Sequence, residues 1–214
     1  VEGSMMKACH WPEEGISILD FKVGSPAAAL AIDILSFTRP RGCLMLGMCG
    51  GLRRKYKVGD FLLPVAAIRG EGTSEFYFPS QVPALSNFVI QKCTADVMDR
   101  QGKEFHIGIC HSTNIRFWEF DPRFRQVLID ERVQGIEMEC ATLFTAGYKR
   151  RVPVGALLLI SDLPLERGGI KTKKSSKSVS QKYTDPHVRL GIDVMKALKG
   201  AKHQGWNAGS KNLD

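Results

Sequence analysis

The segment from residue 135 to residue 162 constrains the fold of this chain more than any other. Glu137 and Glu139 stand just ahead of a stretch with a helical pattern, and the segment ends in an apolar run, Val154 to Ile160, closed by Ser161 and Asp162. An apolar run of this length is typical of a strand buried on both faces. One carboxylate therefore stands at the start of a helix and another at the tip of a strand, where α/β sheets commonly carry catalytic groups. We predict an α/β enzyme.

The rest of the chain alternates between strand-like and helix-like stretches. Period-two alternation and short apolar runs predict strands at 16–23, 43–47, 61–68 and 105–110. Helical patterns cover 27–37, 87–103, 121–130, 139–148 and 186–198. Ser25 as N-cap and Pro26 at the first helical position favour the first of these helices, and residues 47–51 predict a glycine-rich turn. This order predicts a single α/β domain over residues 1–200, with a central, mixed and mostly parallel sheet flanked by helices, and a polar tail at 201–214.

Composition narrows the class of protein. The 214 residues are 43% hydrophobic and 24% charged, and no apolar run approaches the roughly 20 residues needed to span a bilayer. The first residues lack the blocks of a signal peptide, so we expect a soluble, cytoplasmic protein without a membrane partner. The six cysteines form no CxxC pair and no cluster at zinc spacing, which predicts reduced, mostly buried thiols and no metal.

The net charge of +8 leaves several kinds of ligand open. Such an excess suits a nucleic acid, an anionic surface or a small phosphorylated ligand. Much of it lies in residues 171–177 and 196–211, and lysine-rich segments of this kind are usually just solvated. No basic stripe interleaved with aromatic residues is present, so we expect no nucleic-acid partner.

Polar or glycine-rich loops follow the predicted strands at 47–51, 69–74, 112–119 and 161–162. In a mostly parallel sheet these ends share one edge, which predicts a composite site in a single crevice. Each signal has a plain structural alternative. Glu139 can cap its own helix, Asp162 can cap a turn, Arg69 and Glu71 can form an ion pair, and Trp118 can lie in the core.

Taken together, these motifs resemble those of the nucleoside phosphorylase and nucleosidase superfamily. The matching runs are Leu46 to Leu52, Val58 to Phe61, Ala67 to Ser74, Glu137 to Glu139, and Ser161-Asp162. Within the superfamily the pattern is most similar to the bacterial AMP nucleosidases, through residues 69–74, Tyr77, Pro79 and Pro83, Ser112 to Asn114, Trp118-Glu119, Gly155 to Leu159, His187 and Leu190 to Asp193. The similarity covers about residues 3 to 200 in order.

The resemblance implies hydrolysis of the N-glycosidic bond of AMP to adenine and ribose 5-phosphate, with no cofactor. The small-molecule partner that it implies is AMP or a related purine nucleotide or nucleoside. It implies that Asp162 delivers a proton to N7 of the base and that Glu139 binds the ribose hydroxyls, with Met138 against the sugar. Trp118 is expected to stack on the base, and Arg69, Arg116 and Lys171 to Lys174 are the candidates for the 5′-phosphate. The full set of substrate-binding candidates is Gly50, Arg69, Glu71, Thr73, Ser112, Thr113, Asn114, Arg116, Trp118, Glu137, Met138 and Ser161.

Two departures from the family pattern keep alternatives open. Met48 replaces a residue that is usually polar or basic, and the chain begins close to its first predicted strand, where relatives carry an earlier one. The alternatives are a purine nucleoside phosphorylase, a methylthioadenosine-type nucleosidase and an inactive nucleotide-binding homologue. The resemblance also implies homo-oligomers built from dimers, with a hexamer as one form.

Overall fold

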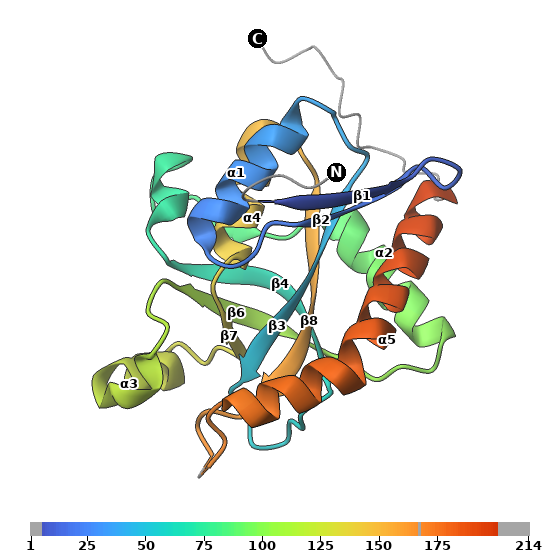
Figure 1. Ribbon diagram of the computed structural model, residues 1–214. Helices are drawn as coiled ribbons and strands as arrows, with labels where there is room; N and C mark the ends of the chain where they lie inside the picture. Colours follow the sequence, from blue (N-terminus) through green and yellow to red (C-terminus); the bar gives the residue numbers. More distant parts are fainter. Residues whose placement is uncertain (1–5, 167, 201–214) are drawn as a thin grey trace.

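The computed structural model describes residues 6–166 and 168–200 as a mixed β-sheet with helices on both sides (Figure 1). The central sheet has the strand order β5-β4-β6-β7-β3-β8. Its strands are β3 (Cys43–Gly51), β4 (Phe61–Gly70), β5 (Ala84–Leu85), β6 (His106–Thr113), β7 (Gly135–Glu137) and β8 (Val154–Asp162). Strand β8 also pairs with β4, so all of these strands except β5 close on themselves like a barrel.

The strands of this sheet run in two directions. Strand β3 is parallel to β8, and β4 is parallel to β6, which is parallel to β7. The two groups meet in antiparallel fashion, at β3 with β7 and at β4 with β8. The predicted mixed sheet is confirmed. The expectation that all four polar strand ends share one edge is wrong, because β4 and β6 run opposite to β3 and β8.

Helices cover both sides of the sheet. Helices α1 (Ser25–Ser36) and α4 (Cys140–Arg150) pack against each other on one side, and α2 (Phe88–Arg100) packs with α5 (Lys173–Gly200) on the other (Figure 1). Helix α3 (Pro122–Asp130) and the short 3-10 helices η1 (Thr73–Phe76) and η2 (Trp118–Phe120) complete the helical elements. The core centres on β8, where Ala156 to Ile160 are fully buried, as the apolar run predicts. No helix within the described residues has the length and apolar character needed to cross a membrane.

The start of α1 differs from the predicted cap. Gly24, not Ser25, is the N-cap residue, and its φ of 100° lies in the region that favours glycine. The hydroxyl of Ser25 instead donates to the carbonyl oxygen of Met138 at 2.6 Å. The helix start is thus tied to the loop ahead of α4 rather than capped by its own side chain.

The glycine-rich run at 47–51 is strand rather than turn. It continues β3 to Gly51 and pairs with both β7 and β8. A Cβ at Gly51 would lie 2.8 Å from Cγ2 of Ile160, closer than real side chains come. The glycines therefore allow close approach of neighbouring strands instead of a change of direction.

The first predicted strand belongs to a separate hairpin. Strands β1 (Lys7–Trp11) and β2 (Ile16–Asp20) pair only with each other among the described strands. The hairpin is held to the C-terminal end of α5, since Lys196 lies 2.9 Å from the carboxylate of Glu14 and its ammonium group is 4.6 Å from the centre of the Trp11 ring. The strand predicted at 16–23 is therefore formed as β2, but it does not join β3 in the central sheet.

Helix α5 begins thirteen residues earlier than its apolar pattern predicts, at Lys173 instead of Pro186. Its first half buries Val179 and places the hydroxyl of Tyr183 3.4 Å from the carbonyl oxygen of Val58. The additional turns at the start of α5 thus contact the loop that contains Val58. Pro186 lies inside the helix instead of at its start. The predicted tail at 201–214 lies outside the described residues.

Candidate active site

A cavity of about 700 Å³ lies between β3 and the hairpin. Residues 16–23 line it from the hairpin side, residues 44–50 from β3, and Val188, Ile192 and Met195 from α5. The loops that follow β6, β7 and β8 complete the wall. The cavity is thus built by segments far apart in the sequence.

The antiparallel junction of β3 and β7 places the two candidate catalytic carboxyl groups in this one cavity. Gly50 is paired with Asp162 on one side and with Ile136 on the other. Because β7 runs opposite to β3, the chain beyond Ile136 leads back along β3 to Glu139. Asp162 therefore lies beside the C-terminal end of β3, and Glu139 lines another part of the same wall.

Asp162 is held at the head of a short hydrogen-bond chain. The hydroxyl of Ser161 donates to Oδ1 of Asp162 at 2.6 Å, and Nζ of Lys171 donates to the same hydroxyl oxygen at 3.2 Å. Burial raises the pKa of Asp162, and the Ser161 hydrogen bond and the charge of Lys171 only partly oppose this. Asp162 thus keeps a proton more readily than an exposed aspartate and suits the role of an acid.

Glu139 links the starts of two helices. Its Oε1 accepts from the backbone N–H of Gly24 at 2.6 Å, and its Oε2 accepts from the N–H of Met138 at 3.2 Å. Burial, together with the charge of Glu137, raises its pKa to about 7. This side chain therefore changes charge near neutral pH, in contrast to an exposed glutamate.

Glu137 lines the cavity, but its carboxylate is engaged inside the protein. Its Oε2 accepts from the N–H groups of Glu139 and Cys140, each at 2.7 Å, and its Oε1 accepts from the hydroxyl of Ser112. The Ser112 oxygen in turn accepts from the N–H of Ala141 at 2.8 Å. Glu137 and Ser112 thus join β6 to the start of α4, where free N–H groups and the helix dipole favour an anion.

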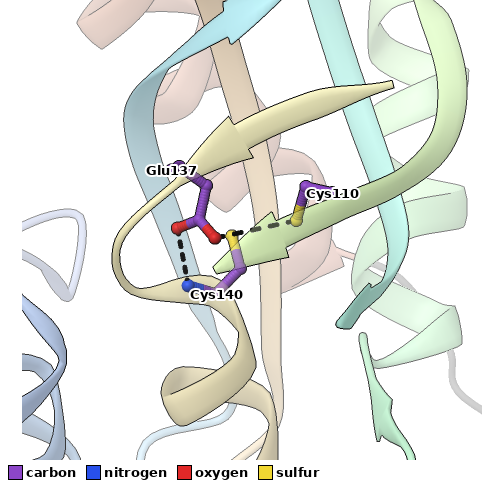
Figure 2. A group of neighbouring side chains, drawn as sticks. All are labelled: Cys110, Glu137 and Cys140. Atoms are coloured by element: carbon purple, nitrogen blue, oxygen red, sulfur yellow. Dashed lines mark hydrogen bonds between the residues drawn. The ribbon is translucent and has the colours of Figure 1, made fainter. Parts of the chain in front are cut away.

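Two thiols surround the same carboxylate (Figure 2). The sulfur of Cys110 lies 3.8 Å from Oε1 of Glu137, and the potential ligand atoms of Cys110, Glu137 and Cys140 are all within 4.8 Å of one another. A metal would need free carboxylate lone pairs and thiolates. The carboxylate already accepts several hydrogen bonds, and burial raises the pKa of the Cys140 thiol well above its usual value. The group is better explained as internal hydrogen bonding than as a metal centre.

The structure brings most of the predicted site residues together. Those that line the cavity are Gly50, Thr113, Arg116, Trp118, Glu137, Met138, Glu139, Ser161 and Asp162. Arg69, Glu71, Thr73, Ser112 and Asn114 do not line it. Strand direction alone does not explain the division, because β6 is parallel to β4 and yet Thr113, Arg116 and Trp118 at its end line the cavity. Residues 69–73 at the end of β4 lie outside the cavity, where they contact η1, α4 and residues 78–82.

Arg69 holds a loop instead of facing the cavity. Its guanidinium group donates to the carbonyl oxygens of Phe78, Pro79 and Val82 at 2.5 to 2.7 Å, and its Nε donates to the Ser74 hydroxyl at 2.9 Å. Four of the five N–H donors of Arg69 are thus directed at protein oxygen atoms. The prediction that Arg69 binds a phosphate group therefore finds no support in the geometry.

Glu71 and its neighbours are likewise engaged internally. The carboxylate of Glu71 accepts from the N–H of Ser74 at 2.9 Å and from the hydroxyl of Thr142 on α4. Asn114 donates its side-chain amide to the carbonyl oxygen of Glu71, and Thr73 begins η1. These contacts fasten the loop after β4 onto α4.

Sequence reasoning did not place Lys22 or Glu119 among the site residues, yet both line the cavity. Glu119 is only 7% exposed, and Arg116 lies 3.5 Å from its Oε1. A single acidic residue in a loop has no sequence periodicity that would indicate burial. The sequence clue for Glu119 was its position next to Trp118, which the family resemblance assigns to stacking on the base.

Comparisons with known proteins show which family this chain resembles. Residues 8–185 match the family model of the phosphorylase superfamily. The chain is 31% identical to the AMP nucleosidase of Escherichia coli strain K12 over 195 residues, which are 87% of this chain. It is 27% identical to the guanosine phosphorylase of Halorubrum lacusprofundi over 186 residues, which are 86% of this chain and 76% of that protein.

A solved structure shows the same fold. The crystal structure of AMP nucleosidase from Bacteroides thetaiotaomicron superposes with a TM-score of 0.76 and 36% identity, covering 87% of this chain and 73% of that one. The chain spans 40% of the length of the E. coli AMP nucleosidase it matches.

Replacing Arg69 by alanine is expected to lower the free energy of unfolding by about 2 kcal/mol, since hydrogen bonds to charged groups are typically worth that much. The loss arises because three carbonyl oxygens on residues 78–82 lose their donor. Urea titration followed by circular dichroism measures it, with Arg123→Ala on the exposed face of α3 as the matched control. Equal stability of the two variants would contradict this role.

Replacing Glu139 by glutamine is expected to stabilise the protein in a pH-dependent way. The native state keeps this proton up to a pKa of about 7, whereas an unperturbed glutamate has a pKa of 4.5. Between these values the native state binds more protons, so wild-type stability falls as pH rises. Relative to wild type, the variant should gain up to about 3 kcal/mol between pH 4.5 and pH 8. This gain adds to a pH-independent loss, because the amide nitrogen cannot accept from one of the N–H groups of Gly24 and Met138.

Denaturant titrations at several pH values measure this difference, with the exposed Glu75→Gln as control. A constant difference between Glu139→Gln and wild type across the pH range would show that Glu139 titrates normally.

Proposed function

We propose that this chain, which belongs to the phosphorylase superfamily, hydrolyses the N-glycosidic bond of AMP to adenine and ribose 5-phosphate. The observation that carries the proposal is the presence of Asp162 and Glu139 on the wall of one cavity. Similarity to two AMP nucleosidases, at 31% and 36% identity, supports the choice of substrate.

Asp162 supplies the acid that the reaction needs. Cleavage of an N-glycosidic bond leaves electrons on the base, and a proton delivered to N7 makes adenine a better leaving group. The raised pKa of Asp162 keeps that proton available, and the Ser161 hydroxyl fixes the direction of its carboxyl group. Lys171 holds Ser161 in turn, so that the acid is oriented by its neighbours.

Glu139 faces the sugar. The transition state resembles a ribosyl oxocarbenium ion, and an ionised carboxylate that accepts from the ribose hydroxyls favours its positive charge. Gly24 and Met138 each donate an N–H to this carboxylate, which fixes it on the wall while leaving lone pairs free for the sugar.

Cations on the cavity wall suit a nucleotide better than a nucleoside. A phosphate monoester carries a charge of about −1.5 to −2 at neutral pH. Lys22, Arg116 and Lys171 line the cavity, and Lys22 is paired with Asp20 at 2.6 Å. Arg116, whose side chain is 53% exposed, and Lys171 are therefore the candidates to bind the 5′-phosphate. These two take the place of Arg69 in the proposal.

Water is favoured over inorganic phosphate as the nucleophile. The part of β3 that lines the cavity carries Met45 and Met48, and thioethers donate no hydrogen bonds to an anion. The rival function is phosphorolysis, which the similarity to a guanosine phosphorylase supports. The dependence of the reaction on phosphate separates the two.

Incubation with AMP, adenosine and methylthioadenosine, each with and without inorganic phosphate, tests the proposal. We expect adenine and ribose 5-phosphate from AMP in the phosphate-free mixture, and slower release from adenosine because Arg116 and Lys171 then lack their partner. Chromatography of the bases and sugars measures the products. Release that requires phosphate would make the protein a phosphorylase, and no release from any substrate would contradict both readings.

Replacing Asp162 by asparagine should keep the fold and lower kcat about 100-fold or more, since a general acid typically contributes 10²- to 10⁴-fold. Asparagine is nearly isosteric and still accepts from Ser161, but it has no proton to deliver to N7. Steady-state rates with AMP measure the loss, and Asp99→Asn on the exposed surface of α2 is the control. Turnover near that of wild type would remove Asp162 from the mechanism.

A further inference from the structure

The carboxylate of Glu119 is an unusual feature of the cavity wall. The residue is 7% exposed and lines the cavity, on the loop that follows β6. Its Oε1 has one distant partner, Nη1 of Arg116 at 3.5 Å. Its Oε2 is buried and has no hydrogen-bond partner within the described residues. A buried acceptor without a donor is costly, so this oxygen calls for an explanation.

The carboxylate of Glu119 differs from those of Glu137 and Glu71 in its hydrogen bonding. Those two carboxylates accept several short hydrogen bonds from backbone and hydroxyl groups. Among the described residues, the Glu119 carboxylate has only the long contact to Arg116, a side chain that is itself half exposed. The terminal torsion of a glutamate is soft, so either oxygen can turn toward a ligand in the cavity.

Glu119 and the proposed acid, Asp162, line the same cavity. Besides burial, which is the main cause, the negative charge of Glu119 contributes to the raised pKa of Asp162. The cavity wall thus holds two carboxyl groups, of which Asp162 is favoured in its protonated form. Such a pair presents one hydrogen-bond donor and one acceptor to a ligand in the same cavity.

That pair is the complement of one edge of adenine. On the edge that carries N7, adenine offers an acceptor at N7 and a donor at its 6-amino group. A 6-oxopurine such as guanine offers acceptors at both N7 and O6. A carboxylate accepts hydrogen bonds and cannot donate one, so it attracts the 6-amino group and repels a 6-oxo group.

We propose that Glu119 selects the base by accepting a hydrogen bond from the 6-amino group while Asp162 donates to N7. The inference rests on the proposed function and deepens it, since it makes the substrate a 6-aminopurine nucleotide and excludes 6-oxopurines. The family match alone does not settle this choice, because a guanosine phosphorylase is among the relatives.

The test compares wild type with Glu119→Gln and Glu119→Asp. The ratio of kcat/KM for AMP to that for IMP measures selection during turnover. Calorimetric titration with adenine and with hypoxanthine measures selection at equilibrium and does not require the protein to be active. Glu75→Gln, an exposed change on η1, is the matched control, and circular dichroism verifies the fold of each variant.

In wild type we expect preference for the 6-amino compound in both measurements. Glutamine can turn its amide to donate to O6, so Glu119→Gln should lower the preference about 10- to 100-fold, the range expected for a hydrogen bond to a charged group. Aspartate keeps the charge but is shorter, so Glu119→Asp should bind adenine more weakly and still reject hypoxanthine. Glu75→Gln should behave as wild type.

The outcomes separate this inference from the proposed function. If wild type releases no base from any nucleotide but binds adenine over hypoxanthine through Glu119, hydrolysis is wrong and the selection stands. If AMP is hydrolysed but Glu119→Gln leaves the ratio unchanged, the proposed function stands and the selection is wrong. Equal binding of the two bases by wild type, or no binding of either, overturns the inference.

Discussion

The buried carboxylate of Glu137 is the interaction on which the rest of the site depends. It accepts from the N–H groups of Glu139 and Cys140 at the start of α4 and from Ser112 on β6. By holding α4 against the sheet it also places Glu139, whose own carboxylate then reaches Gly24 at the start of α1. The starts of α1 and α4 and the end of β6 are therefore joined through the carboxylates of Glu137 and Glu139. These contacts fix the position of Glu139 on the cavity wall.

The reversal of strand direction at β7 has an equally large effect. Because this short strand is antiparallel to β3, the chain after it leads back along β3. One set of polar loops, which includes Glu139 and Asp162, therefore lines the cavity. The other, with Arg69 and Glu71, fastens the loop after β4 to α4 and to residues 78–82. Polar loops at strand ends thus line the cavity in one place and fasten neighbouring elements together in the other.

The cavity concentrates carboxyl groups where burial makes their charge costly. The pKa of Glu139 is raised to about 7, and that of Asp162 is raised as well. A structure chosen for stability alone would place fewer acids there, since buried carboxylates disfavour the folded state as pH rises. The cost is reasonable if these groups handle a proton and a developing positive charge, because the same environment that shifts their pKa values strengthens their action on a substrate.

The sequence by itself determined the α/β class, most of the strands and helices, and the two carboxyl groups of the candidate site. These follow from local patterns, such as the apolar run at Val154 to Ile160, whose burial any packing of the chain requires. The tertiary structure decided the direction of each strand, and with it which motifs share the cavity. Three residues, Gly135 to Glu137, carry too little pattern to reveal a strand, yet their pairing with β3 leads the chain back to Glu139 on the cavity wall. The antiparallel pairing of β4 with β8 carries Arg69 away from Asp162. Glu119 likewise shows its burial only once the loop after β6 is folded against β3, because burial of a lone acidic residue is a property of the assembled wall and not of its neighbours in sequence.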